Sequence, residues 1–213
     1  MGKRATLTVT ALAILLPTAA LAADDCSEAV VQAFGKQHAA KAYRFAAAMP
    51  SEAGVTRMTI DYVRPDRMHQ KVEAPGQPAP VETIAIGRWA WGTQGGGWEE
   101  LQPQFAQSVV AHVHEALIAP PKLTGTFACL GKTSLDGAEV LAYRTVARAS
   151  APAEGSAPAE PELTRTILVD PASGLPVGNV VAEGGAEGKP AVFDGRYSYP
   201  ENLVIEAPIG APK

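Results

Sequence analysis

Residues 62–101 read YVRPDRMHQKVEAPGQPAPVETIAIGRWAWGTQGGGWEEL, and this stretch decides the fold that we expect. It contains four short runs of β-forming residues, separated by three turns that are rich in proline, aspartate or glycine. Such punctuation is typical of antiparallel strands joined by short loops. The glycine run at 95–97 supplies the positive φ angles that a tight hairpin needs. The stretch therefore predicts an antiparallel meander.

Residues 57–62 lead into this meander and alternate polar with apolar side chains. Successive side chains of a strand point to opposite faces of a sheet, so Met58, Ile60 and Tyr62 share one face. We therefore expect a sheet with one apolar and one polar face.

Two helices are predicted, at 24–41 and at 103–119. The second begins at Pro103, a residue that suits the first turn of a helix. Its apolar residues fall on one broad face, and they are Phe105, Val109, Val110, Val113, Ala116 and Leu117. Further strands are predicted at 43–49, 123–133, 138–148, 163–169, 177–182 and 191–199. This element order predicts an α+β fold with an antiparallel sheet.

Residues 1–22 are predicted to be a signal peptide, because Lys3 and Arg4 precede an apolar run and a small-residue cleavage pattern. Cleavage is placed after Ala22, with Ala23 as the second choice. The apolar run is shorter than the roughly 20 residues that span a bilayer, so we expect no stable membrane insertion. The alternative is an uncleaved membrane anchor. The mature product is expected to be a periplasmic protein with a single domain at 23–213.

The charge balance excludes some classes of partner. Loss of Lys3 and Arg4 leaves 16 basic against 22 acidic residues, which is a net charge of −6 for the mature chain. A nucleic-acid-binding protein needs a basic patch or stripe, so no nucleic acid is expected as a partner. Electrostatic adhesion to anionic lipid head groups is also disfavoured.

The chain has two cysteines, Cys26 and Cys129. In an oxidising compartment, a disulfide between them is the expected state. The alternative is two buried, unpaired thiols. Two cysteines alone cannot fill the tetrahedral shell of a zinc ion.

Residues 149–162 contain a near repeat, SAPAEG at 150–155 followed by SAPAEP at 156–161. Such low-complexity sequence buries too little apolar surface to order itself, so we expect a flexible loop there.

No catalytic motif is present, so we expect that the protein is not an enzyme. The sequence has no Gly-x-Ser-x-Gly elbow and no His-Glu-x-x-His segment. His112 and His114 lie two positions apart on a predicted helix, so they point about 200° apart and cannot share a metal ion. We therefore expect no metal and no cofactor.

Several short motifs follow one another along the chain in an order that resembles that of the LolA/LolB-like superfamily of periplasmic outer-membrane lipoprotein carriers. These motifs are VRPDR at 63–67, IG at 86–87 with Trp91 and Trp98, CLG at 129–131, VDP at 169–171 with GLP at 174–176, and YSYP at 197–200. The resemblance covers nearly all of the mature chain. It implies an incomplete β-barrel whose open face is covered by helices, with an apolar cavity that shelters acyl chains.

The resemblance implies a set of ligand-binding candidates: Met58, Ile60, Tyr62, Trp89, Trp91, Trp98, Phe105, Val109 and Val113. The alternative for each of them is ordinary core packing. The function that we expect is non-enzymatic binding of a hydrophobic small molecule or acyl chain by a monomer, with a lipid or lipoprotein carrier as one form of it. The alternative function is an envelope-stress sensor or protein-interaction module of the same fold, with an envelope protein as its partner.

Overall fold

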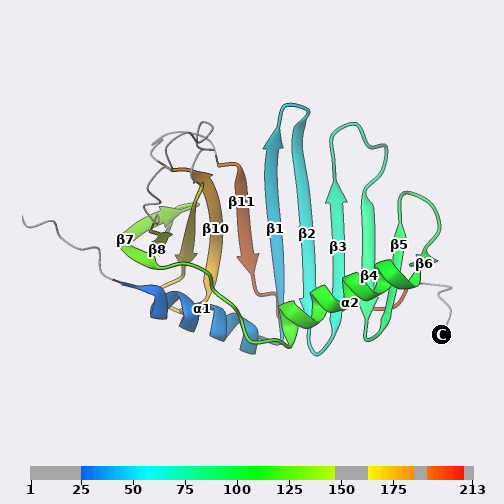
Figure 1. The fold of residues 1–213 in the computed structure, drawn as a ribbon, viewed down its shortest axis with the longest axis horizontal. Helices are drawn as coiled ribbons and strands as arrows, with labels where there is room; N and C mark the ends of the chain where they lie inside the picture. Colours follow the sequence, from blue (N-terminus) through cyan, green and yellow to red (C-terminus); the bar gives the residue numbers. More distant parts are fainter. Residues whose placement is uncertain (1–24, 147–162, 185–190, 209–213) are drawn as a thin grey trace, which may run out of the picture.

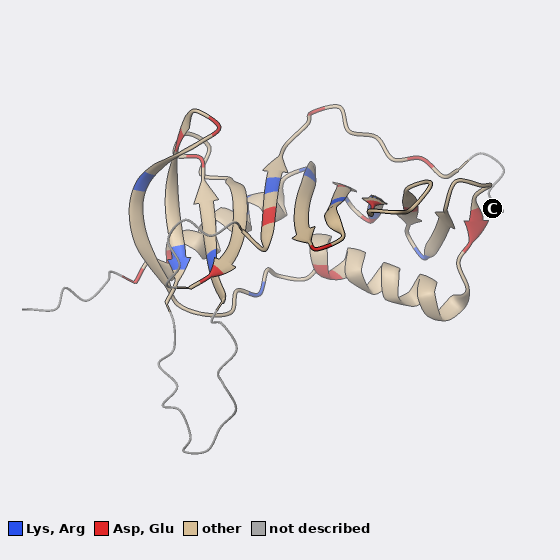
Figure 2. Cartoon of the chain, turned by 90° about the horizontal axis from the view of Figure 1, so that it is seen from above, with Lys and Arg blue, Asp and Glu red and all other residues tan. Residues whose placement is uncertain are grey.

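The computed structural model describes residues 25–146, 163–184 and 191–208. Within these residues the chain forms one antiparallel sheet of eleven strands with two helices, and the sheet curves without closing into a barrel (Figures 1 and 2). The predicted α+β class with an incomplete barrel is therefore confirmed. The predicted signal peptide and the whole predicted loop at 149–162 lie outside the described residues.

The helices are α1 (Ser27–Ala39) and α2 (Pro103–Leu117). The strands of the first half are β1 (Ala42–Ser51), β2 (Gly54–Val63), β3 (Arg67–Glu73), β4 (Val81–Ile86), β5 (Trp89–Thr93) and β6 (Glu99–Glu100). The strands of the second half are β7 (Phe127–Leu135), β8 (Ala138–Thr145), β9 (Leu163–Val169), β10 (Pro176–Glu183) and β11 (Phe193–Ser198).

The sheet consists of two meanders laid side by side. The strand order is β6-β5-β4-β3-β2-β1-β11-β10-β9-β8-β7, so each half pairs in chain order and the halves meet where β1 pairs with β11. At this junction Phe45 lies opposite Tyr197. The predicted meander is thus present, and the pairing of β1 with β11 adds the second one to its edge.

Strand β6, the last of the four runs in the 62–101 stretch, has only two residues. Glu99 and Glu100 pair with β5, and Pro103 then starts α2. Because proline has no N–H to donate to a neighbouring strand, the ladder ends there and the helix begins.

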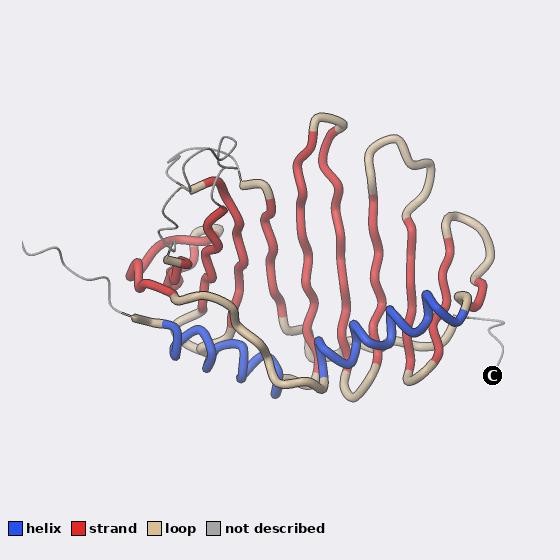
Figure 3. Tube along the Cα trace, in the orientation of Figure 1, coloured by secondary structure: helices blue, strands red, loops and turns tan. Residues whose placement is uncertain are grey.

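Both helices lie on the concave face and cross one margin of the sheet (Figure 3). The apolar residues that alternate along the strands pack against these helices. Under α2, the cluster of buried residues includes Ile60, Tyr62 and Met68 from the sheet with Val113 and Leu117 from the helix. Under α1, a second cluster joins Val30 and Phe34 to Phe127, Ile167 and Val169. The core therefore lies between the sheet and its two helices.

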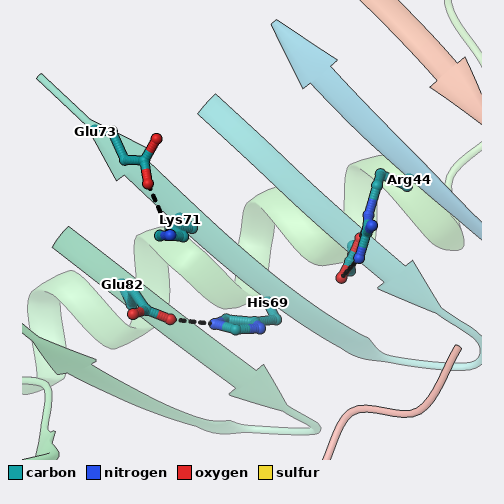
Figure 4. A network of polar contacts seen from close by, with 6 residues as sticks. Arg44, His69, Lys71, Glu73 and Glu82 are labelled. Atoms are coloured by element: carbon teal, nitrogen blue, oxygen red, sulfur yellow. Dashed lines mark hydrogen bonds and ion pairs between the residues drawn. The ribbon is translucent and has the colours of Figure 1, made fainter. Parts of the chain in front are cut away.

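The convex face is polar, as the alternation predicted. Arg44 pairs with Asp61 at 2.6 Å, and neighbouring strands carry the pairs His69–Glu82 at 2.8 Å and Lys71–Glu73 at 2.7 Å (Figure 4). Two apolar clusters interrupt this face, one where Ile205 covers Trp91 and Ile84, and one formed by Val140, Ala142 and Leu168. Figure 2 shows the C-terminal segment running along the side of the sheet away from α2.

Helix α1 is tied to β7 at the sheet edge. Cys26 and Cys129 form a disulfide with 5.5 Å between their Cα atoms. Beside it, the amide of Cys26 donates to the carbonyl of Phe127 at 2.7 Å, and Ser27 Oγ accepts from the amide of Phe127 at 2.9 Å. The N-terminal helix is thereby fixed to a strand that lies far along the chain.

No helix in the described part of the chain is long and apolar enough to cross a membrane.

Candidate functional site

Helix α2 presents two different apolar faces. One face packs on the sheet, with Val113 and Leu117 buried and Val109 half-buried. The other face, which includes Val110 and Ala111, lies beside strand β5 and does not enter the core cluster. Glu115 is the single acidic residue of α2, and the helix contains neither lysine nor arginine, so it is almost free of charge (Figure 2).

The second face of α2 lines a groove of about 550 Å³ against the β5–β6 end of the sheet. We call this the α2 groove. Its apolar lining consists of Trp89, Leu101, Pro103, Ala106, Val110 and Ala111. Its polar lining consists of Arg88, Glu100, Gln107 and His114. Apolar walls with a few polar groups at the rim are the usual make-up of a small-molecule site.

The rim of the α2 groove is aromatic and exposed. Trp89 follows the turn at Gly87, whose φ of 60° is left-handed and suits glycine. The guanidinium of Arg88 lies 4.9 Å from the ring centroid of Trp89, which remains 37% exposed. Phe105, at the start of α2, is 59% exposed, but it does not line the groove. The large apolar side chain of Trp89 is thus available to a ligand at the mouth of the groove.

A polar contact holds α2 on the sheet. Tyr62 Oη and His112 Nε2 are 2.6 Å apart, and the ring of Tyr62 stacks on Tyr43 with 4.8 Å between centroids. Tyr43 donates a long bond of 3.4 Å to the carbonyl of Ala116. Burial raises the pKa of both tyrosines well above the ordinary value, so both hydroxyls stay protonated and able to donate.

The structure divides the predicted ligand-binding residues among four places. Met58, Ile60, Tyr62, Val109 and Val113 come together in the core cluster under α2. Trp91 and Trp98 lie in the convex cluster beneath Ile205. Trp89 lines the α2 groove, and Phe105 is exposed on the helix.

Sequence reasoning missed most of the α2 groove. The residues Arg88, Leu101, Ala106, Ala111 and His114 were not among the candidates. A signal was present, since Pro103, Ala106 or Gln107, Val110 and His114 recur at helical spacing. That stripe could have been separated from the core stripe of Val109, Val113 and Leu117.

Among the described residues, no group of three or more His, Cys, Asp or Glu side chains could hold a metal ion. The two histidines of α2 point apart as predicted. His112 meets Tyr62, whereas His114 lines the α2 groove.

No protein-family model matches this chain, and no curated protein matches its sequence. Solved structures do resemble it. LprF from Mycobacterium bovis superposes with a TM-score of 0.54 at 13% identity, over 87% of this chain and 99% of LprF. An uncharacterized conserved protein from Thermus thermophilus has a TM-score of 0.47 at 10% identity, over 84% of this chain and 90% of that one.

A chain of the MucA/MucB complex of Pseudomonas aeruginosa matches with a TM-score of 0.44 at 9% identity, over 80% of this chain and 55% of that chain. This protein therefore spans about half the length of that match. The similarity to LprF shows that the two proteins share a fold.

Proposed function

We propose that this protein is a non-enzymatic binding protein of the periplasm that holds an apolar or lipid-like ligand in the α2 groove. The observation that carries this proposal is the groove itself, about 550 Å³ with walls formed by Trp89, Leu101 and Val110. That volume lies within the range of about 300–1,000 Å³ typical of small-molecule sites.

The fold and the cysteines support this setting. The open antiparallel sheet with helices on its concave face, shared with LprF, agrees with the motif order that resembles the LolA/LolB-like superfamily. The Cys26–Cys129 disulfide fits an oxidising compartment, as the predicted signal peptide does. We infer a carrier or sensor of the envelope rather than a catalyst.

The energetics favour a long apolar chain as the ligand. Each buried CH₂ group contributes about 0.8 kcal/mol, so ten of them gain roughly 8 kcal/mol. Association costs about 4–15 kcal/mol in lost freedom of motion. Short apolar molecules would therefore bind weakly, and a chain of more than about ten carbons is the better candidate.

The core residues Met58, Ile60, Tyr62, Val109 and Val113 enter this proposal as a second layer. They pack between α2 and the sheet, so they would meet a ligand when that helix lifts from the sheet. The Tyr62–His112 contact would open in the same movement. Ligand entry would then exchange helix packing for ligand packing on the same apolar residues.

The test is a glutamate placed in the α2 groove. Ala111→Glu puts a charge among apolar walls without disturbing the core, since Ala111 is exposed and lines the groove. We expect phenylnaphthylamine, a fluorescent apolar probe, to bind the wild type and to bind this variant at least about tenfold more weakly, because a charge is costly beside an apolar ligand. Fluorescence titration measures both affinities.

The matched control is Ser108→Glu, which adds the same charge to the same helix at an exposed position outside the groove lining. It should leave probe affinity unchanged. Equal affinity in all three proteins would remove the groove as the site. Native mass spectrometry of detergent-free protein, followed by organic extraction, would identify the natural cargo.

Exposed aromatic side chains favour one second candidate function, recognition of an envelope protein. Trp89 presents apolar surface to solvent at the groove, and Phe105 does so elsewhere on α2, as an interface would. A photoreactive phenylalanine analogue at position 105 tests this idea in living cells. A single protein adduct that disappears with Trp89→Ala would support it, and no adduct would count against it.

A further inference from the structure

The concave face carries an arginine that has no acidic partner among the described residues. Arg165 lies in β9 on the same face as Ile167 and Val169, which pack under α1. Its Nε–H donates to Oδ1 of Asn179 at 2.9 Å, and Asn179 is only 8% exposed. Its guanidinium carbon lies 5.9 Å from the ring centroid of Phe34.

In the parts of the chain that the structure describes, no carboxylate lies within ion-pair distance of Arg165. Four other arginines have different partners. Arg44 and Arg196 pair with aspartates, and Arg64 and Arg67 donate to backbone carbonyls. A half-buried cation without a counter-ion is costly to keep, which makes Arg165 a candidate for ligand binding.

Two aromatic side chains, Phe34 and Tyr197, interact with this cation. Tyr197 lies on β11, two strands from β9, and burial raises its pKa while the charge of Arg165 acts in the opposite direction. Phe45 lies 4.8 Å from Tyr197 and 6.0 Å from Phe193, measured between ring centroids. Phe45, Phe193 and Tyr197 are all half-buried, so an apolar surface lies next to the cation.

We propose that Arg165, with Asn179 fixing its orientation, binds the acidic head group of an amphiphile, a carboxylate or a phosphate, whose apolar chain lies over Phe45 and Phe193. Asn179 accepts from one of the five guanidinium N–H groups and Tyr197 makes a further side-chain hydrogen bond with Arg165, which leaves three N–H groups that can bond an oxyanion. The charge of the head group would neutralise Arg165 in the bound state.

This site is separate from the α2 groove and goes beyond the function proposed for it. Seven strand spacings separate β9 from β5 in the sheet. At about 4.8 Å each, these spacings amount to roughly 30 Å along the sheet. The two sites can therefore be disabled one at a time.

The experiment compares cis-parinaric acid, a fluorescent fatty acid, with its methyl ester, which has the same chain and no charge. We expect Arg165→Gln to weaken binding of the acid at least about tenfold and to leave the ester unchanged. Arg144→Gln is the matched control, because Arg144 is an exposed arginine in the adjacent strand β8 that contacts Thr166. It should change neither affinity.

Arg165→Lys keeps the charge and loses the planar fork, so acid affinity should fall severalfold. If the glutamine variant fails to fold, the lysine variant still tests whether Arg165 binds the acidic head group. An unchanged acid affinity in Arg165→Lys and Arg165→Gln would overturn the proposal, as would equal loss of acid and ester. Competition by dodecanoate against dodecyl phosphate then shows which head group the site prefers.

Ala111→Glu separates this proposal from the function proposed for the α2 groove. One outcome is that Ala111→Glu abolishes ester binding, while Arg165→Gln changes the affinities for acid and ester equally. The α2 groove is then supported as a binding site and the head-group site is rejected. The opposite outcome is that Arg165→Gln weakens binding of the acid alone, while Ala111→Glu affects neither probe; the head-group site is then supported and the groove is rejected.

Discussion

Gly195 is a residue whose lack of a side chain is required by its neighbours. A Cβ there would lie 2.7 and 2.8 Å from two ring atoms of Phe45 and 3.1 Å from the carbonyl oxygen of Asn179. Phe45 cannot move away easily, since it packs against both Tyr197 and Phe193. The glycine thus lets an aromatic ring lie flat on the strand, beside the asparagine that holds Arg165.

We expect Gly195→Ala to lower the free energy of unfolding by roughly 1–3 kcal/mol, because the added methyl group overpacks this contact. Urea denaturation measures the change. Gly35→Ala is the opposite case, since Gly35 is an exposed position in α1 with no other atom within 4 Å of an added Cβ. That variant should gain about 0.5–1 kcal/mol from helix propensity. Similar effects of both substitutions would contradict the packing argument.

At the residue scale, the sequence predicted which side chains are notable better than it predicted on which face of the sheet they lie. It identified Trp89, Trp91 and Trp98 as notable, but Trp91 and Trp98 lie on the convex face beneath Ile205. Alternation shows that two residues share a face, and it does not show which face the helices cover. Arg165 gave no signal, because a missing counter-ion is a property of the folded neighbourhood.

Helix α1 depends on its connection to β7. The disulfide closes a loop whose ends are 103 residues apart, and Ser27 and Cys26 add hydrogen bonds to Phe127 next to it. In the chain-entropy model, a cross-link over about 100 residues stabilises the folded state by roughly 4–5 kcal/mol.

Replacing both Cys26 and Cys129 by alanine should therefore lower the free energy of unfolding by about 4 kcal/mol, measured by urea denaturation of the variant and of the oxidised wild type. Ser27→Ala, which removes one hydrogen bond to Phe127, should cost only about 1 kcal/mol. If the double variant lost no more than Ser27→Ala, the cross-link would not be restraining the unfolded chain.

At the element scale, the turns were the strongest sequence signal. The glycine and proline residues between 62 and 101 placed β3, β4 and β5 correctly, and Asp136-Gly137 placed the hairpin of β7 and β8. The broad apolar face of α2 was also present, but only part of it is buried. Because the helix crosses the sheet near its end, Val113 meets the core while Val110 lines the groove.

At the scale of the whole molecule, burial of tyrosines makes the stability of the fold depend on pH in the alkaline range. The pKa values of Tyr43, Tyr62, Tyr197 and Tyr199 are all raised in the folded protein, with burial as the largest cause. A raised folded pKa means that the stabilisation is complete below the unfolded value of about 10 and is lost as pH rises above it.

We therefore expect unfolding above about pH 10, with tyrosinate absorbance and loss of circular dichroism in one transition. Tyr62→Phe keeps the aromatic ring and removes one ionisable group, so stability should fall less steeply with pH in this variant. Tyrosinate formation by these groups well before the loss of secondary structure would contradict the burial argument.

The general architecture could be read from the sequence, and the assembly of its halves could not. Local alternation and turn residues predict hairpins, which bring near neighbours together. The pairing of β1 with β11, which makes one sheet from two meanders, joins strands from opposite ends of the domain. No local pattern around Phe45 or Tyr197 specifies that contact, because it depends on how both meanders curve.

The pairing of β1 with β11, which joins strands far apart in the chain, affects the rate of folding. Within the described sheet, every other pair of adjacent strands is also adjacent along the chain, so hairpin zippering can complete each meander by itself. Joining β1 to β11 requires closure of one long loop, whose entropic cost grows slowly with length. We therefore expect this docking of the two halves to slow folding more than the formation of any hairpin does.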